Sequence, residues 1–430
     1  MLTSLIVFTL ILAIAIFIVW PESSLYALAF LLPAIGWYFY FGPMIIPLID
    51  LAALLAITAF ALRTAGRLIV RPQEKLSIRW PLFLPFAVFL ALSALSALFS
   101  DQPLYSFWYI VRWPLFLYLA YVFLPYNLIT SGRILKRTII ALVLSSFLVA
   151  INGYLSLYGQ DWRDSFFRIR PLAWGGLNLF GENHNLIAEF LNVGAFLIIA
   201  LRYLVKKASL QRWLDIAFAL TALAIVLTFS RAGWITLAIQ TIVYGWYHLR
   251  SKNNSRTSLV VALAALLLVL FPLFWKMEQL QRDNTSSTEN RWLLTEIALQ
   301  AYQERPYFGY GSGQFINLVD DNIRFRAKYG EAIDSHGVLQ KVLAENGVFG
   351  LAAWLFLMAA WLQAGFSALK KYYQKNPWLL PLFLAGAGGL FFQLFNTSYY
   401  KGKVWLPLAI FLAAVRLLDA KYGKRERNEN

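Results

Sequence analysis

One histidine stands where it could accept a proton during catalysis. His336 is one of three histidines in the 430 residues, and it lies near the end of the longest polar stretch of the chain. The sequence predicts a short helix that begins at His336, with Asp334 or Ser335 as its N-cap. The positive end of such a helix favours a neutral imidazole, and a neutral imidazole can act as a general base. The alternative is an ordinary surface histidine beside a helix cap.

Four arginines are candidates for binding a phosphorylated ligand, because a guanidinium group binds phosphate through paired hydrogen bonds. Arg231 follows Ser230 between two apolar segments that almost no loop separates, and Arg291 stands in the polar stretch "TENRWLLTEIALQAY". Arg168 and Arg170 lie close together in "FRIRPLAW", where they could bind phosphate or lipid headgroups. The alternative for Arg291 is a solvated charge on a helix.

Three further residues are weaker candidates. Arg112 and Glu189 fall inside apolar segments, where a charge is costly, so they are expected to face a substrate cavity or to form an ion pair with each other. His184 in "GENHN" stands near a predicted helix start. The scattered histidines and the absence of cysteine predict no metal site and exclude thiol chemistry and disulfides.

The glycine-rich stretch "GYGSGQF" does not predict a nucleotide site. No strand precedes it, and no Lys-Ser or Lys-Thr pair follows it, so it fits neither of the glycine-rich phosphate fingerprints. We predict instead that Gly309, Gly311 and Gly313 form a flexible turn.

The composition is that of a membrane protein. Hydrophobic residues make up 60% of the chain and charged residues only 14%, and the mean hydropathy is +0.59. Apolar runs long enough to cross a bilayer as helices recur along the whole length. A cleavable signal peptide is not expected, because residues 1–20 contain no basic region and no small-residue cleavage site.

The net charge of +16 comes largely from six basic groups in alternate connections between apolar runs. The groups are 63–79, 133–137, 202–212, 250–256, 370–375 and 416–427. The positive-inside rule puts all six in the cytoplasm, so the charge predicts no nucleic-acid partner. Arg231 would then lie on the outer face, where an arginine departs from the rule and predicts an anionic ligand.

The apolar segments predict one all-α, polytopic membrane domain over residues 1–430. They lie near 3–20, 24–41, 43–62, 80–99, 106–127, 138–158, 185–204, 213–229, 232–249, 258–275, 346–366, 377–397 and 403–418. We expect 12 or 13 transmembrane helices, with residues 1–62 crossing two or three times because prolines and glycines interrupt them.

Two loops on the outer face carry most of the candidate residues. One is 160–184, and the other is 276–345, which holds 8 Lys/Arg and 10 Asp/Glu and so lacks the cytoplasmic basic bias. The long loop is expected to contain a helix over 289–304, ended by Pro306, and a second helix that begins at His336 and ends at Asn346-Gly347.

Four stretches together resemble the O-antigen ligase/polymerase family. They are "LNLFGENHNLIAEFL", "TFSRAG", "NRWLLTEIALQAYQERPYFGYGSGQF" and "SHGVLQKVLAENGVFG". Each is short, but their order, with the large outer loop between the last two stretches, is specific. The family usually has Asn after the loop histidine, where this chain has Gly337.

The resemblance implies a GT-C-like membrane glycosyltransferase without metal or other cofactor. Its donor would be a glycan on undecaprenyl diphosphate, and its acceptor lipid A–core or another glycan. The enzyme would lie among the lipids of the bacterial inner membrane with its site on the periplasmic face. His336 would be the base, and Arg231 and Arg291 would bind the diphosphate, with Arg168 and Arg170 as further partners.

Other functions remain open from the sequence. A polymerase or a protein O-oligosaccharyltransferase breaks the same donor bond, and the residues do not reveal the acceptor. A transporter would place its polar residues near the membrane midplane, whereas here they gather at one face. A membrane scaffold would give the outer arginines no purpose.

Overall fold

The computed structural model describes the chain except for residues 1, 42–43, 72, 74–77, 162–166, 176, 182, 251–285 and 430. The described part is mostly helical, with one two-stranded sheet. This confirms the predicted fold class, an all-α polytopic membrane protein. The predicted segment 258–275, residues 276–285 of the long loop and parts of loop 160–184 lie outside the described residues.

The N-terminal region differs from the prediction. Helices α1 (Leu2–Val19) and α2 (Pro21–Leu31) bend by 120° at Trp20, where Pro21 starts the second helix. Strands β1 (Tyr38–Phe41) and β2 (Met44–Pro47) then form an antiparallel hairpin before α3 (Leu48–Val70). The predicted span 24–41 is therefore wrong, because the chain leaves the helix at Leu31 and turns into a hairpin.

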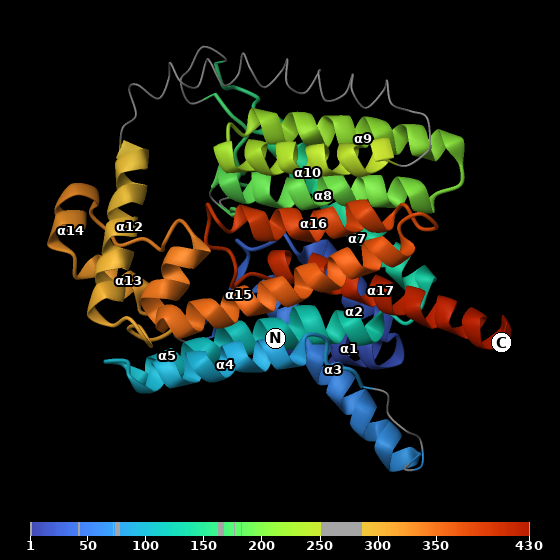
Figure 1. Ribbon diagram of the computed structural model, residues 1–430, viewed down its shortest axis with the longest axis horizontal. Helices are drawn as coiled ribbons and strands as arrows, with labels where there is room; N and C mark the ends of the chain where they lie inside the picture. The colour runs from blue at the N-terminus through green and yellow to red at the C-terminus, as the bar shows by residue number, and fades with distance from the viewer. Residues whose placement is uncertain are drawn as a thin grey trace.

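A bundle of helices follows. It consists of α4 (Phe83–Leu98), the continuous path α5 (Pro103–Ile110), η1 (Val111–Leu115), η2 (Tyr118–Phe123) and α6 (Leu124–Leu128), then α7 (Gly132–Leu155), α8 (His184–Leu204), α9 (Ala208–Leu227), α10 (Arg231–Arg250), α15 (Val338–Tyr372), α16 (Leu379–Phe392) and α17 (Gly402–Glu429). Helix α8 lies inside the bundle, packed against α7, α9 and α16 (Figure 1). Glycines allow these close contacts: a Cβ on Gly194 would lie 2.2 Å from Ser146 Oγ.

Within the described residues, six helices are long and apolar enough to span a membrane, or seven if the bent α1–α2 pair is one span. Helices α4 and α16 are apolar but shorter. The predicted number of 12 or 13 is thus not reached in this part of the chain. Two further predicted segments, 232–249 and 403–418, coincide with α10 and α17, and 258–275 lies outside the described residues.

The described part of the long loop, from Ser286 onward, forms a small helical unit at one end of the bundle. It comprises α12 (Ser286–Glu304), α13 (Phe315–Asp320) and α14 (Ile323–Tyr329), which lie together on the left in Figure 1, away from the C-terminus. Its core contains Leu294, Ile297, Phe315 and Phe325. The prediction of a helix over 289–304 agrees with α12, whereas α13 and α14 were not predicted.

The glycine run joins this unit to the bundle, and it is not the flexible turn that the sequence predicts. Gly309, Gly311 and Gly313 have φ values of 67°, 106° and 84°, which favour glycine. The backbone N–H groups of Tyr310 and Gly311 donate to carbonyl oxygens of α15, at 3.1 and 2.8 Å. The run therefore fixes α12–α14 against α15.

Helix α15 begins two residues later than predicted and continues into the membrane segment. Its N-cap is Gly337, so His336 precedes the helix. The expected end at Asn346-Gly347 appears as a break inside α15, where Gly347 has φ 64° and ψ −167°. A Cβ on Gly347 would lie 2.2 Å from the Tyr307 carbonyl oxygen, so glycine is required for this contact.

Candidate functional site

Arg231 is placed by a tight turn between α9 and α10. Phe229 adopts φ 53°, a conformation that residues other than glycine rarely adopt. Ser230 caps α10, since its Oγ accepts a hydrogen bond from Gly233 N at 3.2 Å. The same Oγ donates to Asn185 Oδ1 on α8 at 2.7 Å. The Ser-Arg motif thus puts Arg231 at the first position of α10, with its side chain exposed.

Arg291 projects from the first half of α12 and lies near Arg231. Burial, together with the charge of Arg231, lowers the pKa of Arg291. The Arg291 Nε atom is buried and has no hydrogen-bond partner in the described part of the chain. Within the described part of the chain, neither Arg231 nor Arg291 forms an ion pair. Two nearby cations that have no anionic partner among the described residues favour an anionic ligand.

His336 lies in the extended segment that leads into α15, next to Arg291. Burial and the charge of Arg291 lower the pKa of His336, and Asp334 opposes them. This lowering favours the neutral imidazole, the form that the proposed role of a base requires. The cause differs from the prediction, since His336 is not in a helical turn and neither Asp334 nor Ser335 is the N-cap.

Hydrogen bonds hold the His336 segment on three sides. Val338 N donates to Gln393 O at 2.9 Å, and Thr397 Oγ1 donates to Ser335 O. Gln340 Nε2 donates to Thr295 Oγ1 at 2.8 Å, and Thr295 Oγ1 donates to Arg291 O at 2.8 Å. The helix that carries Arg291 is therefore tied directly to the segment that carries His336.

Arg168 and His184 lie beside this cluster. Arg168 Nη1 is 3.5 Å from His184 Nε2. The positive charges of Arg168 and Arg291 both interact electrostatically with the His184 ring. Burial and the neighbouring Arg170 lower the pKa of Arg168. The side chain of Arg170 is exposed, and its backbone N–H donates to Ser156 Oγ at 3.1 Å. The structure thus brings Arg168 and His184 toward Arg291 but leaves Arg170 at the margin.

The expected ion pair between Arg112 and Glu189 does not form. Arg112 Nη2 lies 2.8 Å from Asp50 Oδ2, and Tyr121 also donates to this carboxylate, at 3.2 Å. The prediction failed because Asp50, placed in the first turn of α3, is 62 residues from Arg112 in the sequence. Long-range partners of this kind leave no local pattern.

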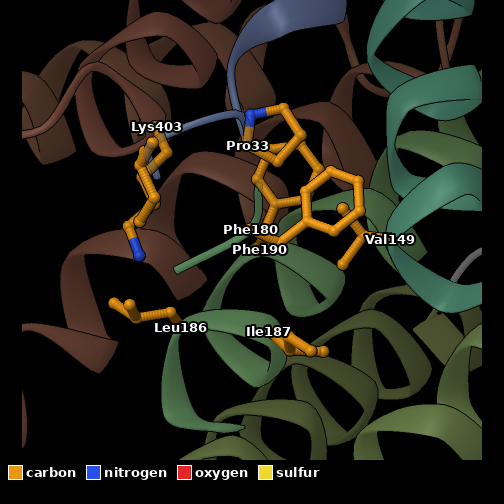
Figure 2. Close-up of a pocket in the computed structure, with 8 residues that line it drawn as sticks. Pro33, Val149, Phe180, Leu186, Ile187, Phe190 and Lys403 are labelled. Atoms are coloured by element: carbon orange, nitrogen blue, oxygen red, sulfur yellow. The ribbon is translucent and has the colours of Figure 1, made fainter. Parts of the chain in front are cut away.

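Glu189 is instead the centre of a buried polar cluster. It is 1% exposed and forms an ion pair with Lys403, and it accepts hydrogen bonds from Gln393 at 2.8 Å and Asn396 at 3.1 Å. Figure 2 shows Lys403 at the edge of a cavity lined by Phe180, Leu186 and Phe190 among others. The cavity measures about 10 Å³, room for one water molecule and far too small for a sugar.

We expect Glu189→Ala to destabilise the protein by roughly 3–5 kcal/mol, because it leaves the Lys403 ammonium buried without a counter-charge. Thermal unfolding of the purified protein in detergent measures the effect. Glu296→Ala is the control, since its partner Arg324 is exposed and a surface pair contributes little. An unchanged melting temperature for Glu189→Ala would show that the cluster does not stabilise the fold.

Several polar residues of the site were not found from the sequence. They are Asn185, Ser230, Asp334 in its ion pair, Lys341 and Lys401. Lys401 stands in the α16–α17 connection, half-buried, and burial and the nearby Lys403 lower its pKa to about 8, against the opposing charges of Glu189 and Asp334. The signal for Lys401 was a pair of lysines in "YYKGKVW" outside the six basic groups.

One family model matches this part of the chain. Residues 216–355, about a third of the chain, match the family model described as O-Antigen ligase. The matched region runs from α9 to α15 and includes Arg231, Arg291 and His336. No curated protein matches the chain. The family match agrees with the resemblance found in the sequence: residues 216–355 are similar to the O-antigen ligase family.

Proposed function

We propose that the protein transfers an oligosaccharide or polysaccharide from undecaprenyl diphosphate to an acceptor hydroxyl, as an O-antigen ligase whose acceptor is lipid A–core. The reaction inverts the anomeric centre and needs no metal. The observation that carries this proposal is the pair of neighbouring arginines, Arg231 and Arg291, without protein counter-ions in the described residues and next to a neutral His336.

The arginines suit the leaving group. When the glycosidic bond to the diphosphate breaks, negative charge grows on the phosphate oxygens. Guanidinium groups held in place before the reaction stabilise that charge, and they are most effective when water is excluded. Arg291 is partly buried and belongs to α12, whereas Arg231 is the first residue of α10. The two arginines would therefore approach the diphosphate from different helices.

His336 suits the attack by the acceptor. The acceptor oxygen forms a bond to the anomeric carbon on the face opposite the diphosphate, and the bond from that carbon to the diphosphate oxygen breaks. The hydroxyl proton goes to the His336 imidazole, and undecaprenyl diphosphate leaves as an anion. The lowered pKa keeps the imidazole free to accept that proton.

The site is proposed to lie on the periplasmic face of the inner membrane. A lipid-linked donor holds its sugar and diphosphate just above the bilayer, which matches a site at one end of the helix bundle. The α12–α14 unit stands at that end, opposite the C-terminus of α17 (Figure 1).

This orientation is tested by cysteine labelling, since the chain has no cysteine of its own. Glu331→Cys, beside α14, is expected to react with a membrane-impermeant maleimide in intact spheroplasts. Lys206→Cys, between α8 and α9, is expected to react only after lysis. Both side chains are exposed, so access alone decides the result. The opposite pattern would place the arginines in the cytoplasm and overturn the proposal.

Reconstitution tests the activity itself. The purified protein, an undecaprenyl-diphosphate-linked oligosaccharide and lipid A–core should give the joined product, and excess EDTA should leave the rate unchanged. A product that appears only with a glycan or a protein as acceptor would instead indicate a polymerase or a protein O-oligosaccharyltransferase. Loss of activity in EDTA, with recovery on adding Mg²⁺, would contradict the metal-independent mechanism.

A further inference from the structure

Three charged side chains, those of Asp334, Lys341 and Glu345, form a buried group next to the His336 segment. Lys341 Nζ is 2.7 and 2.8 Å from the two carboxylate oxygens of Asp334, and 3.6 Å from Glu345 Oε1. The side chains of Lys341 and Glu345 are 2% and 1% exposed, and that of Asp334 is 19% exposed. The proposed transfer reaction assigns no role to these three residues.

The group is fixed by the elements around it. Ser335 N donates to Asp334 Oδ1 at 2.8 Å, so the residue next to His336 is bound to the same carboxylate that Lys341 holds. Phe315 N of α13 donates to Glu345 Oε1 at 3.2 Å. The Tyr400 ring lies 5.4 Å from Lys341 Nζ. The α12–α14 unit, α15 and the α16–α17 connection therefore meet at this point.

Stability alone does not account for three charged groups in this position. Apolar residues of similar volume usually replace a buried ion pair without loss of stability. The arrangement does fix the direction of the backbone at Ser335, one residue before His336. Placing a catalytic side chain within a fraction of an ångström is the kind of task that a second layer of polar contacts performs.

We propose that Asp334, held by Lys341, which also pairs with Glu345, is a positioning residue that aims His336 at the acceptor hydroxyl. This inference rests on the proposed function, because it gives a purpose to the group only if His336 accepts a proton.

The charges that face His336 make this testable by pH. Arg291 of α12 lowers the pKa of His336, and Asp334 raises it. Lys341 and Glu345 belong to α15, and Lys341 pairs with both Asp334 and Glu345. Lys401 of the α16–α17 connection also interacts electrostatically with Asp334. Removing the Asp334 charge leaves Arg291 unopposed, so the pKa of His336 falls and the acid limb of the activity profile moves to lower pH.

The experiment compares Asp334→Asn with the wild type in the reconstituted transfer reaction. We expect kcat to fall roughly 10- to 100-fold from the misplaced imidazole, while KM for the lipid-linked donor stays the same because the arginines are untouched. The acid limb should move to lower pH. Asp101→Asn is the matched control, since its partner Arg305 lies in a surface pair. The control should keep the wild-type kcat and pH profile.

A second variant covers the case in which Asp334→Asn does not fold. Asp334→Glu keeps the charge but lengthens the side chain, so kcat should fall while the acid limb stays in place. Wild-type kcat in either folded variant, or a loss of kcat in Asp334→Asn with an unmoved acid limb, would overturn the positioning role. His336→Ala separates the two hypotheses: if that variant is inactive and Asp334→Asn is normal, the positioning inference alone fails. If His336→Ala is active, the proposed base itself is wrong.

Discussion

Replacing Arg291 by alanine is expected to lower glycan transfer by roughly 1,000-fold or more, with the fold intact. A single preorganised donor to a developing oxyanion contributes about that much, and an arginine opposite a phosphoryl group often contributes more. Arg231→Ala should have a similar effect. The Nε atom of Arg291 is buried without a hydrogen-bond partner in the described residues, so its removal costs the fold no bond seen there. Steady-state transfer with the lipid-linked donor measures both variants.

Lysine in place of either arginine should recover only part of the activity, because an ammonium group lacks the planar pair of donors that matches a phosphate. Arg324→Ala is the control. That arginine is exposed on α14 and bound to Glu296, so its loss should leave transfer unchanged. Near-normal rates in both Arg231→Ala and Arg291→Ala would show that the diphosphate binds elsewhere.

His336→Ala should reduce transfer by roughly 100- to 10,000-fold, which is the usual contribution of a positioned base. Donor binding should persist, since the arginines remain. In the wild type, activity should fall as the pH drops through the imidazole pKa, because imidazolium cannot accept a proton. Burial and Arg291 lower that pKa, so the fall should occur below the ordinary value of about 6.5.

The rival role for His336 is donation of a hydrogen bond to phosphate. In that case His336→Gln would keep much of the activity, and acid would not abolish it. His184→Ala provides the comparison, because His184 belongs to the same cluster and also faces Arg291. If His184→Ala is inactive while His336→Ala transfers normally, the two histidines exchange roles.

The elements of the site could be predicted where a local pattern determines the structure. Pro306 marks the end of α12, and the Asn346-Gly347 pair marks the break in α15. The short break between two apolar segments placed Arg231 at the start of α10, and Arg291 fell within the predicted helix 289–304. These features depend on neighbouring residues, so one sequence is enough to reveal them.

The rest depends on contacts between distant parts of the chain. Arg112 finds Asp50, and Glu189 finds Lys403, only after the bundle has formed. The β1–β2 hairpin replaces part of an apolar run, and Gly36 just before it packs on the loop at Asn178, where a Cβ would lie 1.7 Å from the carbonyl oxygen. The start of α15 moved for a similar reason: Val338 N bonds to Gln393 O, and Gly337 becomes the cap.

The hydrogen bond between Gln340 and Thr295 joins α12 to the His336 segment as one structural unit. Arg231 belongs to another, because Ser230 anchors its turn to Asn185 on α8. A diphosphate bound by both arginines would link these two structural units. Loading the donor would then stiffen the enzyme around a histidine and an arginine whose spacing is already set, and release of the spent carrier would loosen it again for the next substrate.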